Sequence, residues 1–234
     1  MEANLIYKTV EYNGISIKAS IMSPQDPPLP DALFLLHGGG LQADMQRFSV
    51  LRSKLCSMNI ETIAFDFIGH GVTGGDLFTT SLFDRTKQAL AVMRFFNREN
   101  CSILGTSMSA YIAIHLTQYV NVKKLILSVP AIYSRHVFKV PFGKEFSAII
   151  RQKDSWIDSD AWDICENYKG KVLIITAQND DVIPKEIPTI LNKKFTKAFI
   201  LTNLSFDCGH QILPYINNNP IEVDRLAIEI HKLF

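Results

Sequence analysis

The 234-residue sequence predicts an α/β fold: a mostly parallel central sheet with a leading antiparallel hairpin and helices on both faces. Short, almost wholly apolar runs recur along the chain, as expected of strands that are covered on both faces. Longer segments with helical spacing of apolar residues separate those runs, and this alternation favours parallel strands with right-handed crossovers. The whole chain, residues 1–234, is expected to form one domain.

The first thirty residues differ from the rest because they contain two alternating runs, "LIYKTVEYN" and "ISIKASIM", around Asn13-Gly14. Asn-Gly accommodates the positive φ of a tight turn, so these runs predict an antiparallel hairpin. The following "SPQDPPLPD" is interpreted as an extended surface loop, because proline can neither donate to a sheet nor enter a helix interior.

The remaining elements follow in alternation. Helices are predicted in "FSVLRSKLCSM", in "SLFDRTKQALAVMRFF" and within Ile221–Phe234, because apolar residues fall on one face. The apolar runs expected to form strands are Ala32–Leu36, Ile60–Phe65, Cys101–Leu104, Val122–Val129, Val172–Thr176 and Ala198–Leu201.

One segment, residues 131–168, breaks the alternation because it is rich in aromatic residues but contains no clear strand. We interpret it as a small cap insertion over the strand ends. The alternative is a pair of helices packed on the sheet edge. Its first half also carries a basic cluster, which can meet an acidic acyl carrier protein or an anionic substrate, or can simply be a solvated face. The cluster consists of Arg135, Lys139, Lys144, Arg151 and Lys153.

Composition excludes several function classes. The formal net charge is +1, with 24 basic and 23 acidic residues, so no global field would recruit nucleic acid. The N-terminus lacks the features of a signal peptide, and no apolar stretch approaches the ~20 residues that cross a bilayer. The four cysteines are scattered without a C-x-x-C pair; Cys56, Cys101 and Cys165 are interpreted as small buried hydrophobic residues. We expect a cytoplasmic protein without cofactor, metal or disulfide.

Candidate functional residues follow the strands, because open parallel sheets bind ligands outside the carboxyl ends of their strands. The first is "HGGG" at 37–40, whose three glycines let backbone N–H groups approach an oxyanion; the alternative is a flexible turn. The second is "DFIGHG" at 66–71. Asp66 and His70 there resemble a catalytic pair, but a structural turn is the preferred interpretation.

The third candidate is "GTSMS" at 105–109, between an apolar run and the helical "AYIAIHL". A serine becomes a nucleophile when a tight strand-to-helix turn exposes it and a base lies nearby. Gly105 and Ser109 are the small residues that such a turn needs around Ser107, and the Met108 N–H is a free donor at the helix start. The alternative is an ordinary turn.

A nucleophilic serine needs a base and a carboxylate that orients the base, and two further strand ends offer candidates for both. "AQNDDVIP" offers two aspartates, Asp180 and Asp181, either of which can orient a histidine or cap the next helix. "TNLSFDCGHQIL" places His210 beyond the last strand, beside Gly209. His115, His136 and His231 fit less well, because they lie in predicted helices or in the predicted cap.

Together these motifs resemble the α/β-hydrolase superfamily over nearly the whole chain, with "HGGG", "DFIGHG", "GTSMS", "NDDVIP" and "CGH" in the family's order. The family's acid stands four residues before the proline of a D-x-x-x-P turn, which selects the first aspartate of the two. The departure is Ser109, where the elbow motif has glycine. The resemblance implies Ser107 as nucleophile, Asp180 as acid, His210 as base, and the N–H groups of Gly39 and Met108 as oxyanion donors, with Gly40 close by.

The resemblance implies a serine hydrolase that cleaves a carboxylic ester or thioester of a small molecule through an acyl-enzyme. An acyl-carrier or CoA thioesterase and an acyltransferase are alternatives, since the same triad serves both. A peptidase or C–C hydrolase is a more distant alternative. A non-catalytic ligand-binding member of the fold is the alternative of another class.

Overall fold

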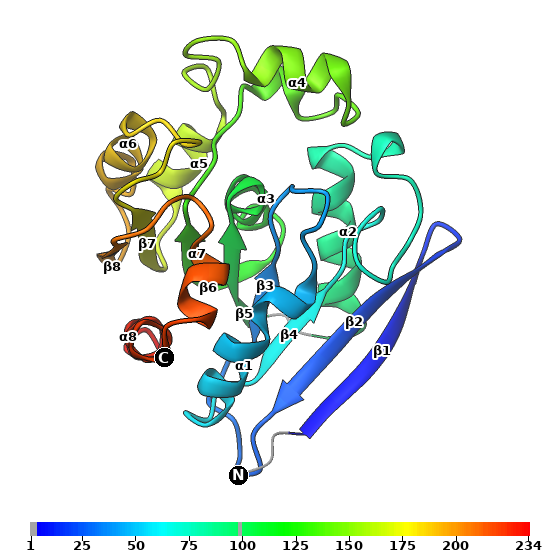
Figure 1. The fold of residues 1–234 in the computed structure, drawn as a ribbon, viewed down its shortest axis with the longest axis vertical. Coiled ribbons are helices and arrows are strands. Elements are labelled where there is room, and N and C mark those ends of the chain that lie inside the picture. Colours follow the sequence, from blue (N-terminus) through cyan, green and yellow to red (C-terminus); the bar gives the residue numbers. More distant parts are fainter. Residues whose placement is uncertain (1–3, 98–99) are drawn as a thin grey trace.

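The computed structural model describes residues 4–97 and 100–234 and contains an eight-stranded sheet (Figure 1). The strand order is β1-β2-β4-β3-β5-β6-β7-β8, antiparallel at the β1–β2 and β2–β4 pairs and parallel elsewhere. The predicted fold class is therefore confirmed. The strands are β1 (Asn4–Tyr12), β2 (Ile15–Ser23), β3 (Leu33–Leu36), β4 (Thr62–Phe65), β5 (Asn100–Thr106), β6 (Asn121–Ser128), β7 (Lys171–Ala177) and β8 (Ile200–Phe206).

Helices cover both faces of the sheet (Figure 1). The apolar sides of α1, α7 and α8 pack into one core, and those of α2, α3, α5 and α6 into the other. The helices are α1 (Ser49–Cys56), α2 (Leu82–Phe95), α3 (Met108–Leu116), α4 (Lys144–Ile150), α5 (Ala161–Asn167), α6 (Glu186–Lys194), α7 (Ile212–Asn217) and α8 (Pro220–His231), with the short 3-10 helices η1 (Met45–Phe48), η2 (Leu77–Thr79) and η3 (Arg135–Val137).

The central strands explain why the sequence shows unbroken apolar runs. Leu33 and Leu35 of β3 enter the core under α1 and α8, whereas Phe34 and Leu36 enter the opposite core. All four side chains are fully buried. Successive side chains of a strand point to opposite faces, so a strand between two helix layers must be apolar at every position.

The structure corrects two of the predicted elements and adds one. The run Ala198–Leu201 only partly overlaps β8, which continues to Phe206. Polar residues interrupt the apolar pattern of β8 because it is the last strand of the sheet and is less buried than its neighbours. The last helix begins at Pro220, one residue before the predicted segment. The short helix α7 was not expected, and it directly follows the His210 loop.

Residues 131–168 hold η3, α4 and α5. The helix α5 joins the same core as α3, while α4 lies beyond the carboxyl ends of β5 and β6 at the top of Figure 1. Aromatic rings link the segment internally, with the centroids of Phe142 and Phe146 5.0 Å apart. The assignment of 131–168 as a cap remains a prediction about how the segment acts.

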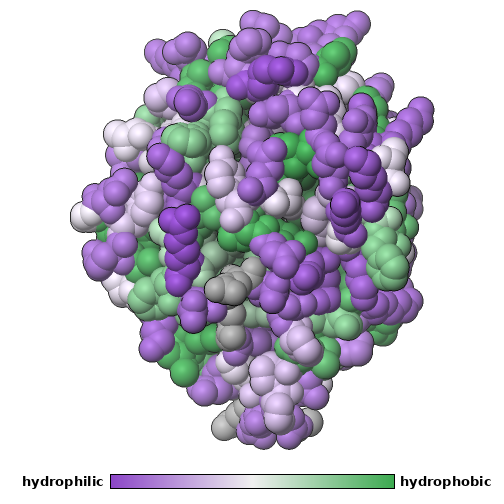
Figure 2. Space-filling view, turned by 180° about the vertical axis from the view of Figure 1, so that it is seen from behind, coloured by the Kyte–Doolittle hydropathy of each residue, from purple (hydrophilic) through white to green (hydrophobic). Residues whose placement is uncertain are grey.

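The surface mixes polar and apolar side chains. Figure 2 shows one face on which hydrophobic residues are interspersed among hydrophilic ones. Within the described parts of the chain, no helix has both the length and the apolar character that crossing a bilayer requires. As predicted, Cys56, Cys101 and Cys165 are buried, and Cys101 and Cys165 lie among the apolar side chains of the core that contains α2 and α3.

Candidate active site

Ser107 occupies a strained turn between β5 and α3. Its φ of 52° and ψ of −116° lie where L-residues are uncommon, and such strain is often found at functional sites. Gly105 makes the turn possible, because a Cβ at this position would lie 2.2 Å from the backbone oxygen of Ser109. The Ser107 N–H donates to the carbonyl of Ser128 at 2.8 Å. The backbone thus fixes Ser107 at the carboxyl end of β5.

The structure brings the three predicted triad residues into one hydrogen-bonded line. Ser107 Oγ lies 3.0 Å from His210 Nε2, and His210 Nδ1 lies 2.9 Å from Asp180 Oδ2. The side chains of His210 and Asp180 are only 12% and 10% exposed. The three residues follow β5, β8 and β7 respectively, so they meet only because these strands run in parallel and end at one edge.

Of the two candidate aspartates, only Asp180 reaches the histidine. Its Oδ1 accepts hydrogen bonds from the N–H groups of Val182 and Ile183, both at 2.9 Å, which leaves Oδ2 for His210. Asp181 is exposed to solvent. Neither aspartate caps α6. Asp180 therefore fixes its own turn with one oxygen and orients the imidazole with the other.

The glycine loop after β3 passes beside the serine. A Cβ on Gly38 would lie 3.5 Å from Ser107 Cβ, and a crevice of about 70 Å³ is lined by Gly38–Gly40, Ser107 and His210. Met108 is the first residue of α3, and the N–H groups of a first helical turn have no acceptor within the helix. The structure therefore places both predicted oxyanion donors, Gly39 and Met108, around the serine.

Ser109 and His37 hold the start of this loop. Ser109 is fully buried, and its hydroxyl donates to the carbonyl of His37 at 2.5 Å. Burial lowers the pKa of His37 well below its usual value, so the ring is neutral. Its Nε2 accepts from the Phe67 N–H at 3.2 Å, which leaves Nδ1 to donate to the Gly38 carbonyl at 2.9 Å. The serine that departs from the elbow motif thus anchors the glycine loop.

The "DFIGHG" segment forms a structural turn, as preferred from the sequence. The Asp66 carboxylate accepts from the N–H groups of Met45 at 2.7 Å and Val72 at 3.0 Å. A Cβ on Gly71 would lie 2.1 Å from Asp66 Oδ2, so the turn closes tightly on the carboxylate. Burial raises the pKa of Asp66. The hydrogen bonds of Asp66 are therefore committed to the fold.

Sequence reasoning missed Arg85, a fully buried residue of α2. Its guanidinium lies 4.9 Å from the ring centroid of Phe67 and 4.8 Å from that of Phe142. Its Nη2 is 3.2 Å from each ring nitrogen of His70, and Nη1 is 3.4 Å from the Gly38 carbonyl. Burial lowers the pKa of Arg85 to about 9, so it stays charged at neutral pH. No local motif marks it, because its partners come from distant segments.

Arg85 also lies at the wall of a large cavity. This cavity has a volume of about 840 Å³ and shares Gly39 with the crevice at Ser107. Its lining includes Gly39 and Met108, the two predicted oxyanion donors, and residues of the helix α4. The large cavity and the crevice at Ser107 therefore lie on either side of the glycine loop. The lining residues are Gly39, Leu41, Leu77, Phe78, Arg85, Met108, Phe142, Gly143, Lys144, Phe146, Ser147, Ala148, Ile150 and Arg151.

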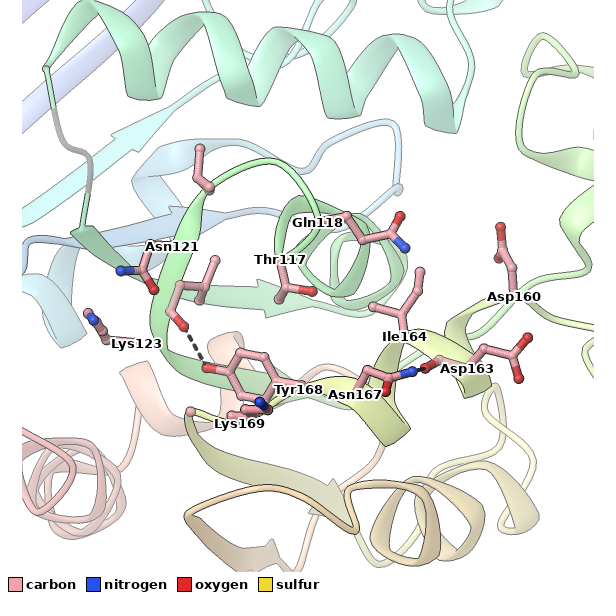
Figure 3. Close-up of a pocket in the computed structure, with 13 residues that line it drawn as sticks. Thr117, Gln118, Asn121, Lys123, Asp160, Asp163, Ile164, Asn167, Tyr168 and Lys169 are labelled. Carbon is pink, nitrogen blue, oxygen red and sulfur yellow. Dashed lines mark hydrogen bonds between the residues drawn. The ribbon is translucent and has the colours of Figure 1, made fainter.

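A second hollow, of about 640 Å³, lies at the opposite edge of the sheet, where β6 and β7 begin (Figure 3). Its wall includes Asn121, Lys169 and Tyr168, whose hydroxyl donates to the Val122 carbonyl at 3.1 Å. Among the described residues that line it there is no serine, cysteine or histidine, so it lacks a serine or cysteine nucleophile and an imidazole base. In the described residues, no group of three His, Cys, Asp or Glu side chains is placed to hold a metal ion.

Comparisons with known proteins agree with this architecture. Residues 28–157, more than half of the chain, match the family model described as serine aminopeptidase, S33. No curated protein sequence matches the chain. Three similar solved structures are a predicted CIB-like hydrolase from Thermoplasma acidophilum (15% identity, TM-score 0.72, 99% of this chain and 100% of that one), an esterase from Exiguobacterium antarcticum (16%, 0.73, 97% and 100%), and Est1E from Butyrivibrio proteoclasticus with ferulic acid bound (18%, 0.70, 95% and 98%).

At these identities the structural matches show the fold, and the family model shows the membership. The resemblance drawn from the sequence motifs is thereby confirmed. The chain belongs to the serine aminopeptidase S33 family of α/β-hydrolases.

Proposed function

We propose that the protein is a serine hydrolase that cleaves carboxylic esters or thioesters through an acyl-enzyme. The observation that carries this proposal is the line from Ser107 Oγ to His210 Nε2 and from His210 Nδ1 to Asp180 Oδ2, at 3.0 and 2.9 Å. A nucleophile, a base and an orienting carboxylate within hydrogen-bond reach are the arrangement that acyl transfer requires. A non-catalytic relative has no need to keep all three in register.

Each group has a role in the proposed reaction. His210 Nε2 accepts the proton of Ser107 as Oγ attacks the acyl carbonyl, and Asp180 stabilises the imidazolium that forms. The N–H groups of Gly39 and Met108 receive the developing oxyanion, and removal of one such donor typically costs about 3–4 kcal/mol. His210 then donates its proton to the leaving group. A water activated by the same imidazole hydrolyses the acyl-enzyme and restores the Ser107 hydroxyl.

The lining of the large cavity favours esters over peptides with a free amino terminus. An aminopeptidase must hold a substrate ammonium group, and a buried or half-buried cation needs a carboxylate partner. The residues that line the cavity include Arg85, Lys144 and Arg151 but no aspartate or glutamate. The rest of the lining is mostly apolar, which suits an acyl chain or an aromatic ring.

The test combines covalent labelling with turnover. A fluorophosphonate probe is expected to label the wild type at Ser107, and the protein is expected to hydrolyse 4-nitrophenyl esters of some chain length between acetate and palmitate. Acyl-CoA thioesters, assayed with and without an added alcohol acceptor, separate esterase, thioesterase and acyltransferase activity. The Ser107→Ala variant is expected to lose both labelling and turnover, by about 10⁶-fold in kcat.

The matched control is Ser57→Ala, because Ser57 is exposed and its hydroxyl donates to the carbonyl of Lys54 on the surface. This variant is expected to label and turn over as the wild type does. A wild type that neither labels nor hydrolyses any of these substrates would show that the fold serves ligand binding instead.

A further inference from the structure

The cavity beside the active site has an uneven charge. Three cationic side chains, Arg85, Lys144 and Arg151, line it without any carboxylate among the lining residues. Lys144 and Arg151 are exposed at α4 and its end, whereas Arg85 is fully buried at the other wall. Fixed positive charge in an otherwise apolar cavity attracts a negatively charged ligand group.

The buried cation is poorly satisfied. A guanidinium has five N–H donors. Arg85 Nη2 contacts the His70 ring, and Nη1 makes a 3.4 Å contact to the Gly38 carbonyl and a 3.6 Å contact to Met108 Sδ. Its Nε has no partner among the described residues, and in the same part of the chain no carboxylate forms an ion pair with it. Burying an unpaired charge is costly, so the site gains free energy from any anion that reaches it.

A second buried arginine shows what a purely structural guanidinium looks like here. Arg52 is 4% exposed, and it donates to the hydroxyls and the carbonyls of both Ser20 and Thr62 at 2.7–3.2 Å. Those four bonds use four of the five N–H donors and give each nitrogen at least one oxygen acceptor without an anion. In residues 4–97 and 100–234, Arg85 has one oxygen contact, at 3.4 Å, so its guanidinium is far less satisfied than that of Arg52.

A ligand can reach Arg85 from the cavity. Two of the side chains that contact the guanidinium, Met108 and Phe142, line the cavity together with Arg85 itself. A methionine side chain is unbranched and changes rotamer at low cost, so displacement of the Met108 thioether opens the way. The Met108 backbone belongs to the proposed oxyanion hole, so an anion bound here is part of a molecule whose carbonyl lies at Ser107.

We propose that Arg85 is the anion-binding residue of the active site and that the protein acts on esters or thioesters whose acyl or leaving group carries a carboxylate. This inference rests on the proposed hydrolase function and narrows its substrate class. The carboxylate takes the place of the Met108 thioether on the guanidinium and supplies the missing counter-ion. Paired Arg–carboxylate bonds are among the stronger and more directional contacts available in a protein.

The test uses pairs of esters that differ in one carboxylate. In the acyl arm, 4-nitrophenyl hydrogen adipate is compared with 4-nitrophenyl heptanoate. In the leaving-group arm, 4-carboxyphenyl butyrate is compared with phenyl butyrate. The wild type is expected to prefer the acidic ester in one arm. Arg85→Met is expected to lower kcat/KM for that ester by about 10–100-fold, mainly through KM, and to change the neutral ester far less. Arg85→Lys is expected to give an intermediate kcat/KM for the acidic ester, because lysine keeps the positive charge but lacks the paired N–H donors of a guanidinium.

Two arginine variants serve as controls. Arg94→Met removes an exposed arginine of the same helix and is expected to change neither ester. Arg52→Met is expected to lower the midpoint of urea unfolding while leaving the ratio of acidic to neutral ester unchanged. If Arg85→Met lowers activity on both members of each pair equally, Arg85 is a structural residue and the proposal is wrong. A wild type that does not prefer the acidic ester in either arm would also overturn the proposal.

Binding of adipate to the Ser107→Ala protein, measured by calorimetry, separates this proposal from the proposed function. Adipate is expected to bind this protein, and the double variant with Arg85→Met is expected to lose that binding. Adipate binding that depends on Arg85, without hydrolysis of any ester by the wild type, would support the anion site and reject the hydrolase. Hydrolysis that shows no preference for the acidic esters, together with no binding of adipate, would support the hydrolase and reject the anion site.

Discussion

Two groups of polar side chains, one partly buried and one fully buried, flank the glycine loop, and they are built in opposite ways. In the first, Ser107, His210 and Asp180 are joined by hydrogen bonds of 3.0 and 2.9 Å, and the second oxygen of Asp180 is held by backbone N–H groups. In the second, the Arg85 guanidinium rests on two aromatic rings and a neutral His70, and its Nε has no partner among the described residues.

The difference corresponds to two proposed tasks: the first group aligns the reacting atoms, and the second binds a charged part of the substrate. Groups that must move a proton benefit from being fully paired beforehand, because no reorganisation is then needed during the reaction. A group that binds a charged ligand benefits from having unused hydrogen-bond donors and no counter-ion, because the ligand then supplies the missing acceptors and charge. The first group is complete without substrate, whereas the second is not.

Among variants that keep the Ser107 hydroxyl, the largest expected effect comes from changing the carboxylate of the paired group. Asp180→Asn should keep the turn, because the amide oxygen can still accept from the N–H groups of Val182 and Ile183. It should lower kcat by about 10⁴-fold, because the imidazolium loses its stabilising charge and the ring its tautomer. The neighbouring Asp181→Asn is the matched control and should leave kcat unchanged, since Asp181 is exposed. Similar losses in the two variants would show that Asp180 does not orient the base.

The two groups also differ in how far the sequence reveals them. The paired group was predictable because each member lies in a short motif at a strand end, and parallel strands bring such ends together. The choice between Asp180 and Asp181 came from the family pattern alone, and the structure places Asp180 against the histidine as that pattern implies. In the fold, central strands were predictable because two helix layers force them to be apolar, whereas the less buried β8 was misplaced.

Arg85 and Ser109 show where sequence reasoning ends. A charged residue in an amphipathic helix is usually solvated, and nothing in "DRTKQ" distinguishes Arg85 from its neighbours. Its burial depends on Phe67 and Phe142, which come from separate segments. Likewise, Ser109 registers in the sequence only as a departure from a motif, and its bond to His37 is visible only in three dimensions.

The unpaired group is expected to contribute, through His70, to the loss of stability at acid pH. Burial, and after it the charge of Arg85, lowers the pKa of His70 from 6.5 to about 4. Below pH 6.5 the imidazole of His70 is therefore protonated in the unfolded chain but still neutral in the folded protein. The contribution of His70 to the free energy of unfolding is complete above pH 6.5 and is lost as the pH falls towards 4. A shift of this size corresponds to at most about 3 kcal/mol.

Urea unfolding of the wild type between pH 7 and 4 measures this loss. His70→Gln should show a shallower decline, because it removes the titrating ring while His37, whose pKa is shifted in the same direction, still contributes. His136→Gln is the control, since that side chain is 77% exposed and should not alter the slope. Parallel profiles for the wild type and His70→Gln would mean that His70 is protonated as easily in the folded protein as in the unfolded chain.

The smallest expected effect concerns the glycine loop that joins the two groups. The Ser109 hydroxyl holds the His37 carbonyl, and Arg85 approaches the carbonyl of the next residue, Gly38. Ser109→Ala removes one hydrogen bond and leaves a buried carbonyl unsatisfied, so the free energy of unfolding should fall by about 1–2 kcal/mol. The loop should also loosen beside Ser107, and kcat should fall with it.

Ser102→Ala in β5 is the matched comparison. Ser102 is also fully buried, but its hydroxyl has no hydrogen-bond partner in residues 4–97 and 100–234. Deleting an unpaired buried hydroxyl removes a desolvation cost without removing a bond, so this variant should be as stable as the wild type or more stable. Urea unfolding of both variants measures the difference. If Ser109→Ala is as stable as Ser102→Ala, the bond to His37 does not hold the loop, and serine at position 109 does no more than fit the elbow.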